Sequence, residues 1–327
     1  MKTVFSKIPF LFAVLLAATS CVHEYPEDGG GVDPTNIETT LTLYTVPELS
    51  RAIAYSPGED CRYVYFKVEI YKNDFSGELV KTERIGVRKA DDGSASVELK
   101  LPLHAGKYKV LAWATGTQSP DNPGTGFNTD DMAAITFPGQ YKGSSEDKEC
   151  YEARFDLNLA DQGWYGKAEH KQEMRSPMGG VEVISTDADL FLIQMASRAG
   201  SEDWDDYEMR WSYGLYFPVG YNAYSGVPNQ ADTNVGFISP ISAITATDAS
   251  LGFDYIFVNG EKSQVSLTLE VIDKATGKTI NTYSGIQVPL RRGQMTIIRG
   301  KYLTTSHNSG IGINPDFDGD INITLPD

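Results

Sequence analysis

Histidine and cysteine, the side chains that most often ligate metals or act as nucleophiles, are scarce in this sequence. None of the four histidines has a second histidine or a cysteine at ligand spacing; they are His23, His104, His170 and His307. A G-x-S-x-G elbow, a Walker A loop and a dinucleotide-binding glycine motif are all missing from the sequence. Carboxylate pairs for glycosidic cleavage leave no local signature, so that chemistry stays open. We expect a protein that is not an enzyme and needs no cofactor.

One acidic segment near the C-terminus has part of the pattern of a calcium loop. Oxygen-bearing side chains recur there at alternate positions, namely Asn314, Asp316, Asp318 and Asp320. Gly319 stands at the sixth position, as in an EF-hand, but Leu325 occupies the twelfth, where a bidentate glutamate belongs. No flanking helices are expected. We therefore expect a turn that leads into a final strand at residues 321–325, with a calcium site as the weaker alternative.

Two of the three cysteines, Cys61 and Cys150, precede expected strands. In an exported chain they could form a disulfide, which would close a long loop and contribute about 4 kcal/mol by the loop-entropy estimate. The alternative is two unpaired cysteines that fill space in the core. The sequence leaves both open.

Aromatic residues are concentrated in one stretch of the second half. Its Trp and Tyr residues are Trp204, Tyr207, Trp211, Tyr213, Tyr216, Tyr221 and Tyr224. The period-two spacing of Trp211 and Tyr213 indicates one buried face of a strand. Residues 218–235, rich in Gly, Asn and Pro, are expected to form an exposed loop. Tyr221 and Tyr224 on this loop are therefore candidates for contacting a ligand or a partner.

The first twenty residues have the parts of an export signal. Lys2 and Lys7 precede an apolar stretch at residues 8–18, which is too short to span a bilayer. The small residues before Cys21 resemble a bacterial lipoprotein signal, in which cleavage falls between Ser20 and Cys21 and the cysteine takes the lipid. An ordinary signal peptide is the alternative. Residues 21–36 are polar, acidic and rich in glycine, so we expect a flexible tether.

The charge balance excludes some partners. The chain has 28 Lys plus Arg and 44 Asp plus Glu, which gives −16, and removal of residues 1–20 takes away two lysines, which gives 26 − 44 = −18. Because binding to nucleic acid needs clustered cations, we expect no nucleic-acid partner. A solvated surface protein is compatible with this charge.

Alternation with period two dominates from residue 37 onward and predicts an all-β protein. In residues 62–72, for example, Val64, Phe66, Val68 and Ile70 share one face, which predicts a half-buried antiparallel strand. Alternation fades at residues 160–180, where we place a domain boundary. The expected domains are β-sandwiches at residues 37–165 and 166–327. One short helix is expected in the second domain, with Asp187 near its N-cap and its end near Gly200.

Several segments resemble one group of known proteins. They are residues 110–114 (VLAWA), 127–131 (FNTDD), 175–178 (RSPM), 216–222 (YFPVGYN), 254–260 (DYIFVNG), 288–290 (VPL), 297–300 (IIRG) and 319–322 (GDIN). Together with the lipoprotein start, they are similar to the fimbrillin-type lipoproteins of Bacteroidota, in particular to an uncharacterised family within that superfamily. The resemblance implies two tandem transthyretin-like antiparallel β-sandwich domains, attached by a lipid to the outer membrane and displayed at the cell surface.

The resemblance also implies a mode of assembly. Related pilins are completed by an extended strand donated from a neighbouring subunit, after an arginine-directed protease has removed the leader and the first strand. Arg51 is the first arginine of this chain and follows the strand expected at residues 39–45. Cleavage there would release a polymerising subunit, whereas an uncleaved chain would serve as an anchor. The alternative is that Arg51 is an ordinary loop residue.

The leading hypothesis is a non-catalytic surface lipoprotein with a structural or adhesive role in a fimbria, acting as anchor or subunit. Its partners would be the membrane, through the lipid, and other fimbrial subunits or surface proteins. The alternative is a lipoprotein that binds a surface polysaccharide through exposed aromatic loops.

Overall fold

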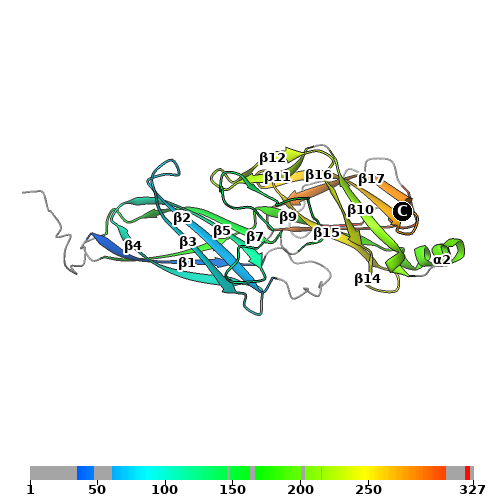
Figure 1. Ribbon diagram of the computed structural model, residues 1–327, viewed down its shortest axis with the longest axis horizontal. Helices are drawn as coiled ribbons and strands as arrows, with labels where there is room; N and C mark the ends of the chain where they lie inside the picture. The colour runs from blue at the N-terminus through cyan, green and yellow to red at the C-terminus, as the bar shows by residue number, and fades with distance from the viewer. Residues whose placement is uncertain are drawn as a thin grey trace, which may run out of the picture.

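The computed structural model describes residues 35–47, 61–124, 126–145, 148–162, 166–199, 203–214, 216–306 and 321–324. Almost all of these residues lie in strands or in the turns between them, and the described part has a single α-helix. The all-β prediction is confirmed. Figure 1 shows two lobes along the longest axis, one built around β1 to β5 and the other around β9 to β17, with helix α2 at the far end of the second.

The first lobe is a sandwich of two sheets, which we call the first sandwich. One sheet has the order β4-β1-β8 and the other the order β3-β2-β5-β7. The strands are β1 (Asn36–Thr45), β2 (Tyr63–Lys72), β3 (Leu79–Arg88), β4 (Ala95–His104), β5 (Lys107–Thr117), β7 (Cys150–Asn158) and β8 (Lys167–Met174). Alternate apolar residues of both sheets meet in one core that includes Leu41, Phe66, Leu99 and Val110.

The second lobe is a larger sandwich, the second sandwich, with sheets of order β13-β10-β16-β17 and β14-β15-β9-β18-β19. Its elements are β9 (Met178–Ser185), α2 (Ala188–Ala199), the 3₁₀ helix η2 (Trp204–Asp206), β10 (Tyr207–Tyr213), β13 (Gly236–Pro240), β14 (Ser242–Ala243), β15 (Ala249–Phe257), β16 (Lys262–Asp273), β17 (Lys278–Arg291), β18 (Met295–Gly300) and β19 (Ile321–Thr324). Trp211 and Tyr213 are buried in its core, as their spacing predicts.

A small third sheet connects the two lobes. It has the order β12-β11-β6, with β6 (Ile135–Thr136), β11 (Phe217–Asn222) and β12 (Val227–Asp232). The expectation of a loop at residues 218–235 was therefore wrong. Gly and Pro suggested a loop, but β11 and β12 form an irregular hairpin whose register shifts near Gly220, and β11 also pairs with β6 from the first half of the chain.

Three strand pairs are parallel, which the antiparallel expectation did not include: β1 with β8, β9 with β18, and β18 with β19. Strand β8 had no strand prediction because its sequence, KAEHKQEM, is mostly polar. It follows the expected boundary at residue 165 yet lies in the first sandwich, where His170 stacks on Phe155 with 4.6 Å between ring centroids. The chain passes to the second sandwich after Met174. The division of the chain into two domains stays a prediction.

Helix α2 lies where the sequence predicts a helix, but one detail of its start differs. The backbone oxygen of Asp187 accepts the hydrogen bond of Phe191, as expected for an N-cap. Its carboxylate points away from the helix and accepts hydrogen bonds from the backbone nitrogen of Thr304 at 2.8 Å and from the Ser185 hydroxyl. The side chain therefore fixes the segment after β18 to the helix start.

Candidate functional site

Strand β1 lies between two partners in the first sandwich. It is antiparallel to β4 from Asn36, opposite His104, to Thr45, opposite Ala95. It is parallel to β8 over almost the same length, from Glu38 to Thr45. Because both edges of β1 are paired, a first sandwich without β1 would have a slot between two open strand edges.

The side chains of β1 divide cleanly between the two faces. Ile37, Leu41 and Leu43 are fully buried in the first core. On the other face, Glu38 is exposed and forms an ion pair with Lys167 of β8 at 3.1 Å. Another extended segment with apolar residues at alternate positions could fill the same slot, because that alternation sets the register of a strand in a sheet.

Several predicted site residues lie outside the described residues. They are Ser20 and Cys21 of the lipoprotein signal, Arg51, and the calcium-loop positions Asn314, Asp316, Asp318 and Asp320. Among the residues that the structure does describe, no group of three or more His, Cys, Asp or Glu is placed to hold a metal ion. None of the described helices has the length and apolar character needed to span a bilayer.

Tyr221 and Tyr224 are not on an exposed loop, contrary to expectation. Tyr221 is fully buried, and its ring stacks on Phe257 with 5.0 Å between centroids. Both tyrosines pack in a cluster between the sandwiches, to which the first half of the chain contributes Trp113 and Phe127. We call this the junction cluster. A polysaccharide could not reach Tyr221 without opening the junction.

A charged network crosses the junction beside Tyr221. The Tyr221 hydroxyl donates to Glu152 Oε1 at 2.6 Å, and Arg292 Nη1 donates to the same oxygen at 2.9 Å. Burial raises the pKa of Tyr221, and the nearby Glu152 carboxylate raises it further. Tyr221 therefore stays a neutral donor, and the opposed charges of Glu152 and Arg292 hold strand β7 against the end of β17.

A second polar contact across the junction is more deeply buried. Lys148 forms an ion pair with Asp254 of β15, and both side chains are almost inaccessible to water. Tyr141 and Tyr213 each donate to Asp254 Oδ2 at 2.6 Å. Burial lowers the pKa of Lys148, while the Asp254 carboxylate opposes that shift. With its ion pair and hydroxyl donors, the Asp254 carboxylate is well compensated for the loss of water.

The third polar contact involves Tyr224. Its hydroxyl lies 2.7 Å from the Tyr71 hydroxyl and 3.2 Å from Glu69 Oε2. Glu69 is in turn paired with Lys67 at 3.1 Å, and Lys67 donates to the Thr129 carbonyl at 2.6 Å. The face of β2 that was expected to meet solvent is thus covered by the second half of the chain and by the segment before β6.

These three contacts share one arrangement, and the sequence gives almost no local signal of it. In each, a charged residue of the first half (Glu152, Lys148 or Glu69) meets a partner of the second half. Glu152 and Arg292 are 140 residues apart in the sequence. The one hint was an acidic or basic residue in an otherwise apolar alternating run, as at Glu69. The arrangement holds the two sandwiches in a fixed relation rather than exposing reactive groups.

No disulfide joins Cys61 and Cys150 in the structure. Cys61 lies over Gly116, beside Glu149, on the face of the sheet that packs on the first core. Cys150 belongs to the junction cluster on the opposite face. Burial raises the pKa of the Cys150 thiol well above its usual value. The predicted pairing would require both side chains on one side of the sheet, so the structure does not support the Cys61–Cys150 disulfide.

Known proteins that resemble this chain include one protein family and several solved structures. A family model described as "Family of unknown function (DUF6562)" matches residues 30–326. No curated protein matches the chain. Among solved structures, the fimbrial anchor protein Mfa2 from Porphyromonas gingivalis is similar at 15% identity and a TM-score of 0.40, over 76% of this chain and 81% of that one. A fimbrial assembly protein from Parabacteroides distasonis is similar at 10% identity and a TM-score of 0.39, over 81% and 91% of the two chains.

Proposed function

Because the chain belongs to the family of unknown function DUF6562, we propose its function from its own geometry: a non-catalytic fimbrial anchor or subunit that assembles through an exchanged β-strand. In this proposal, residues 1–20 are removed as a signal and Cys21 takes a lipid that holds the chain at the outer membrane, facing outward. Residues 21–36 act as a tether, and the two sandwiches act as structural domains.

The position of β1 is the observation that carries the proposal. The first strand of the described chain is the inner strand of its sheet, paired on both edges. Arg51 follows it by six residues, within a segment that connects β1 to β2. A cut there would separate β1 from the rest, and a strand from a neighbouring subunit could then fill the slot with backbone hydrogen bonds and alternating side chains.

The junction supports a structural role. The junction consists of a buried aromatic cluster and three polar contacts. Side chains from both halves of the chain therefore hold the two sandwiches together. A body built in this way transmits force between its ends better than two sandwiches joined by a flexible linker. This suits a protein that connects a membrane anchor to a filament.

The proposal is tested by replacing β1 in the intact chain. A protease site is placed within residues 48–60, the chain is cut, and a labelled peptide of residues 34–47 is offered during refolding. We expect the peptide to enter the slot and to fail when Leu41 and Leu43 are changed to Asp, because those side chains are buried.

The matched control changes Thr40 and Thr42, which lie on the other face of β1, to Asp. This peptide carries the same added charge and should still bind. Strand exchange is contradicted if the cut chain takes up no peptide, or if it takes up all three peptides equally well.

A further inference from the structure

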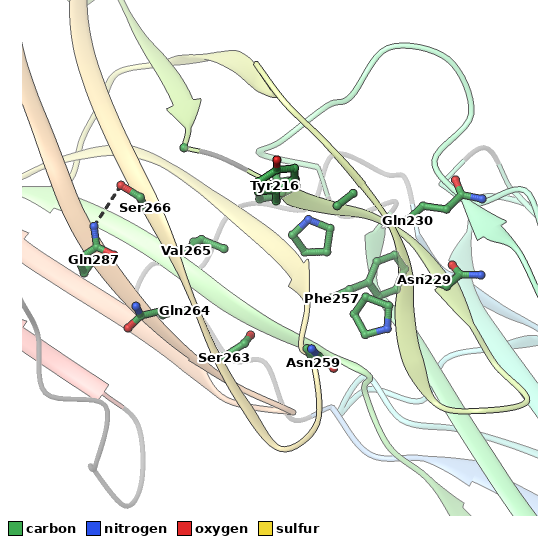
Figure 2. A pocket seen from close by; sticks show the side chains of 15 residues that line it. Tyr216, Asn229, Gln230, Phe257, Asn259, Ser263, Gln264, Val265, Ser266 and Gln287 are labelled. Atoms are coloured by element: carbon green, nitrogen blue, oxygen red, sulfur yellow. Dashed lines mark hydrogen bonds between the residues drawn. The ribbon is translucent and has the colours of Figure 1, made fainter.

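A cleft on the second sandwich has the chemistry of a ligand site. It lies apart from β1 and from the three polar junction contacts, although Phe257 of the junction cluster forms part of its lining. It has a volume of about 770 Å³, within the range of about 300–1,000 Å³ typical of ligand pockets. The hairpin β11–β12 forms one wall. The start of β16 and its partner strand β17 form the other (Figure 2). We propose that this cleft binds a neutral carbohydrate.

Every residue that lines the cleft is uncharged, in a chain whose net charge is −16. Amide side chains supply most of its polar groups, including Gln230, Asn259, Gln264 and Gln287. Each amide carries both a donor and an acceptor, which matches the hydroxyl groups of a sugar, since those also donate and accept. Charged ligands would find no opposite charge in the lining.

Three of these amides are available to a ligand. Gln230, Asn259 and Gln264 are exposed, and no described residue forms a hydrogen bond with their side chains. Gln287, by contrast, donates to the Ser266 hydroxyl at 3.2 Å (Figure 2). Gln230 comes from the hairpin, Asn259 from the turn before β16 and Gln264 from the start of β16, so a single ligand could contact both walls.

Tyr216 adds an aromatic surface at the same cleft. Its side chain is 75% exposed, the largest exposed fraction among the large hydrophobic residues of the described chain. Its backbone has φ of 57°, a conformation that costs about 1–3 kcal/mol for a residue other than glycine. The ring can stack on the apolar face of a sugar ring, and Pro218 and Pro228 extend the apolar part of the lining.

The arrangement favours a carbohydrate over an added peptide strand. A strand would be held by backbone groups along a free sheet edge, with pockets for alternate side chains. Here the available groups are side-chain amides on two facing walls with a tyrosine beside them. The site is also distinct from Tyr221 and Tyr224, which the junction covers.

The test uses the purified full chain in native gels that contain a neutral polysaccharide, with a β-glucan, an α-glucan and a mannan as probes. Polygalacturonate and heparin serve as anionic probes. We expect at least one neutral polysaccharide to retard the chain. Tyr216→Ala should weaken that binding about tenfold, whereas Tyr216→Phe should keep it within about threefold, because stacking needs the ring and not the hydroxyl.

Gln264→Glu tests the neutral character of the cleft, because it keeps the shape of the side chain and adds a charge; we expect weaker binding. Ile193→Ala is the matched control, since Ile193 is a large exposed side chain on α2, outside the cleft lining. It should leave binding unchanged, and unfolding midpoints establish that all variants are folded.

The proposal is overturned if no neutral polysaccharide binds, if only the anionic probes bind, or if Tyr216→Ala leaves binding unchanged. It is also overturned if Tyr216→Ala instead abolishes association between copies of the chain.

Discussion

Glu152 shows how much depends on single side chains at the junction. Its carboxylate accepts hydrogen bonds from both Tyr221 and Arg292 in a site that is almost closed to water. In Glu152→Gln, the Arg292 charge would lose its buried counterpart, and we expect a loss of about 3 kcal/mol in the free energy of unfolding. Urea denaturation measures it. Glu83→Gln is the control, because the Glu83–Lys81 pair is largely open to water and should contribute less than about 1 kcal/mol. Equal losses in the two variants would contradict this view of the junction.

Tyr302 offers a prediction about pH. The side chain is buried, its hydroxyl has no hydrogen-bond partner among the described residues, and burial raises its pKa. The same direction holds for Tyr71, Tyr151 and Tyr213. Above pH of about 10 the unfolded chain releases these protons while the folded chain keeps them, so stability falls as pH rises. The lowered pKa of Lys148 acts in the opposite direction but is a single group.

Tyr302→Phe should therefore raise stability at neutral pH by about 1 kcal/mol, because an unsatisfied buried hydroxyl is removed. It should also make the loss of stability above pH 10 less steep, by up to about 1.4 kcal/mol per pH unit. Unfolding midpoints at pH 8 and near pH 11 provide the comparison. A variant that is less stable at pH 8, or that falls as steeply as the parent chain, would show that the hydroxyl has a partner.

At the scale of elements, helix α2 has one buried face and one exposed face. Phe191 and Met195 face the second core, whereas Leu190 and Ile193 are 48% and 66% exposed. Phe191→Ala should cost about 3–5 kcal/mol. Ile193→Ala, a matched truncation on the same helix, should cost less than about 1 kcal/mol. Thermal unfolding distinguishes the two, and a larger loss for Ile193→Ala would contradict the helix orientation.

The strands show how far sequence alone can lead. Alternation places the strand at residues 62–72 correctly to within one residue, because the face with Val64, Phe66 and Val68 lies on the first core and the pattern records it. Strand β8 has no such pattern, and it is held mainly by its parallel pairing with β1, a contact across more than 120 residues of sequence. Tyr221 was assigned to an exposed loop from the Gly and Pro residues around it. It is buried because side chains from the first half of the chain pack against it. The charged junction contacts were missed for the same reason.

At the scale of the whole molecule, the junction cluster should make the two sandwiches unfold together. Trp113 and Phe127 from the first half pack there with Tyr221 and Phe257 from the second. We expect one calorimetric transition for the parent chain. Trp113→Ala, which empties the middle of the cluster, should cost about 3–5 kcal/mol and separate the transition into two. Two separate transitions in the parent chain would contradict a shared junction.

The N-terminus of the surface form is the most direct test of the proposed function. Mass spectrometry of the chain taken from intact cells would identify both its first residue and any attached lipid. We predict an acylated chain that begins at Cys21 if the protein is an anchor, or a chain that begins at Ala52 and lacks β1 if it is a released subunit. A chain that still carries residues 1–20, or one that begins at Val22 without a lipid, would contradict a lipid-anchored fimbrial protein.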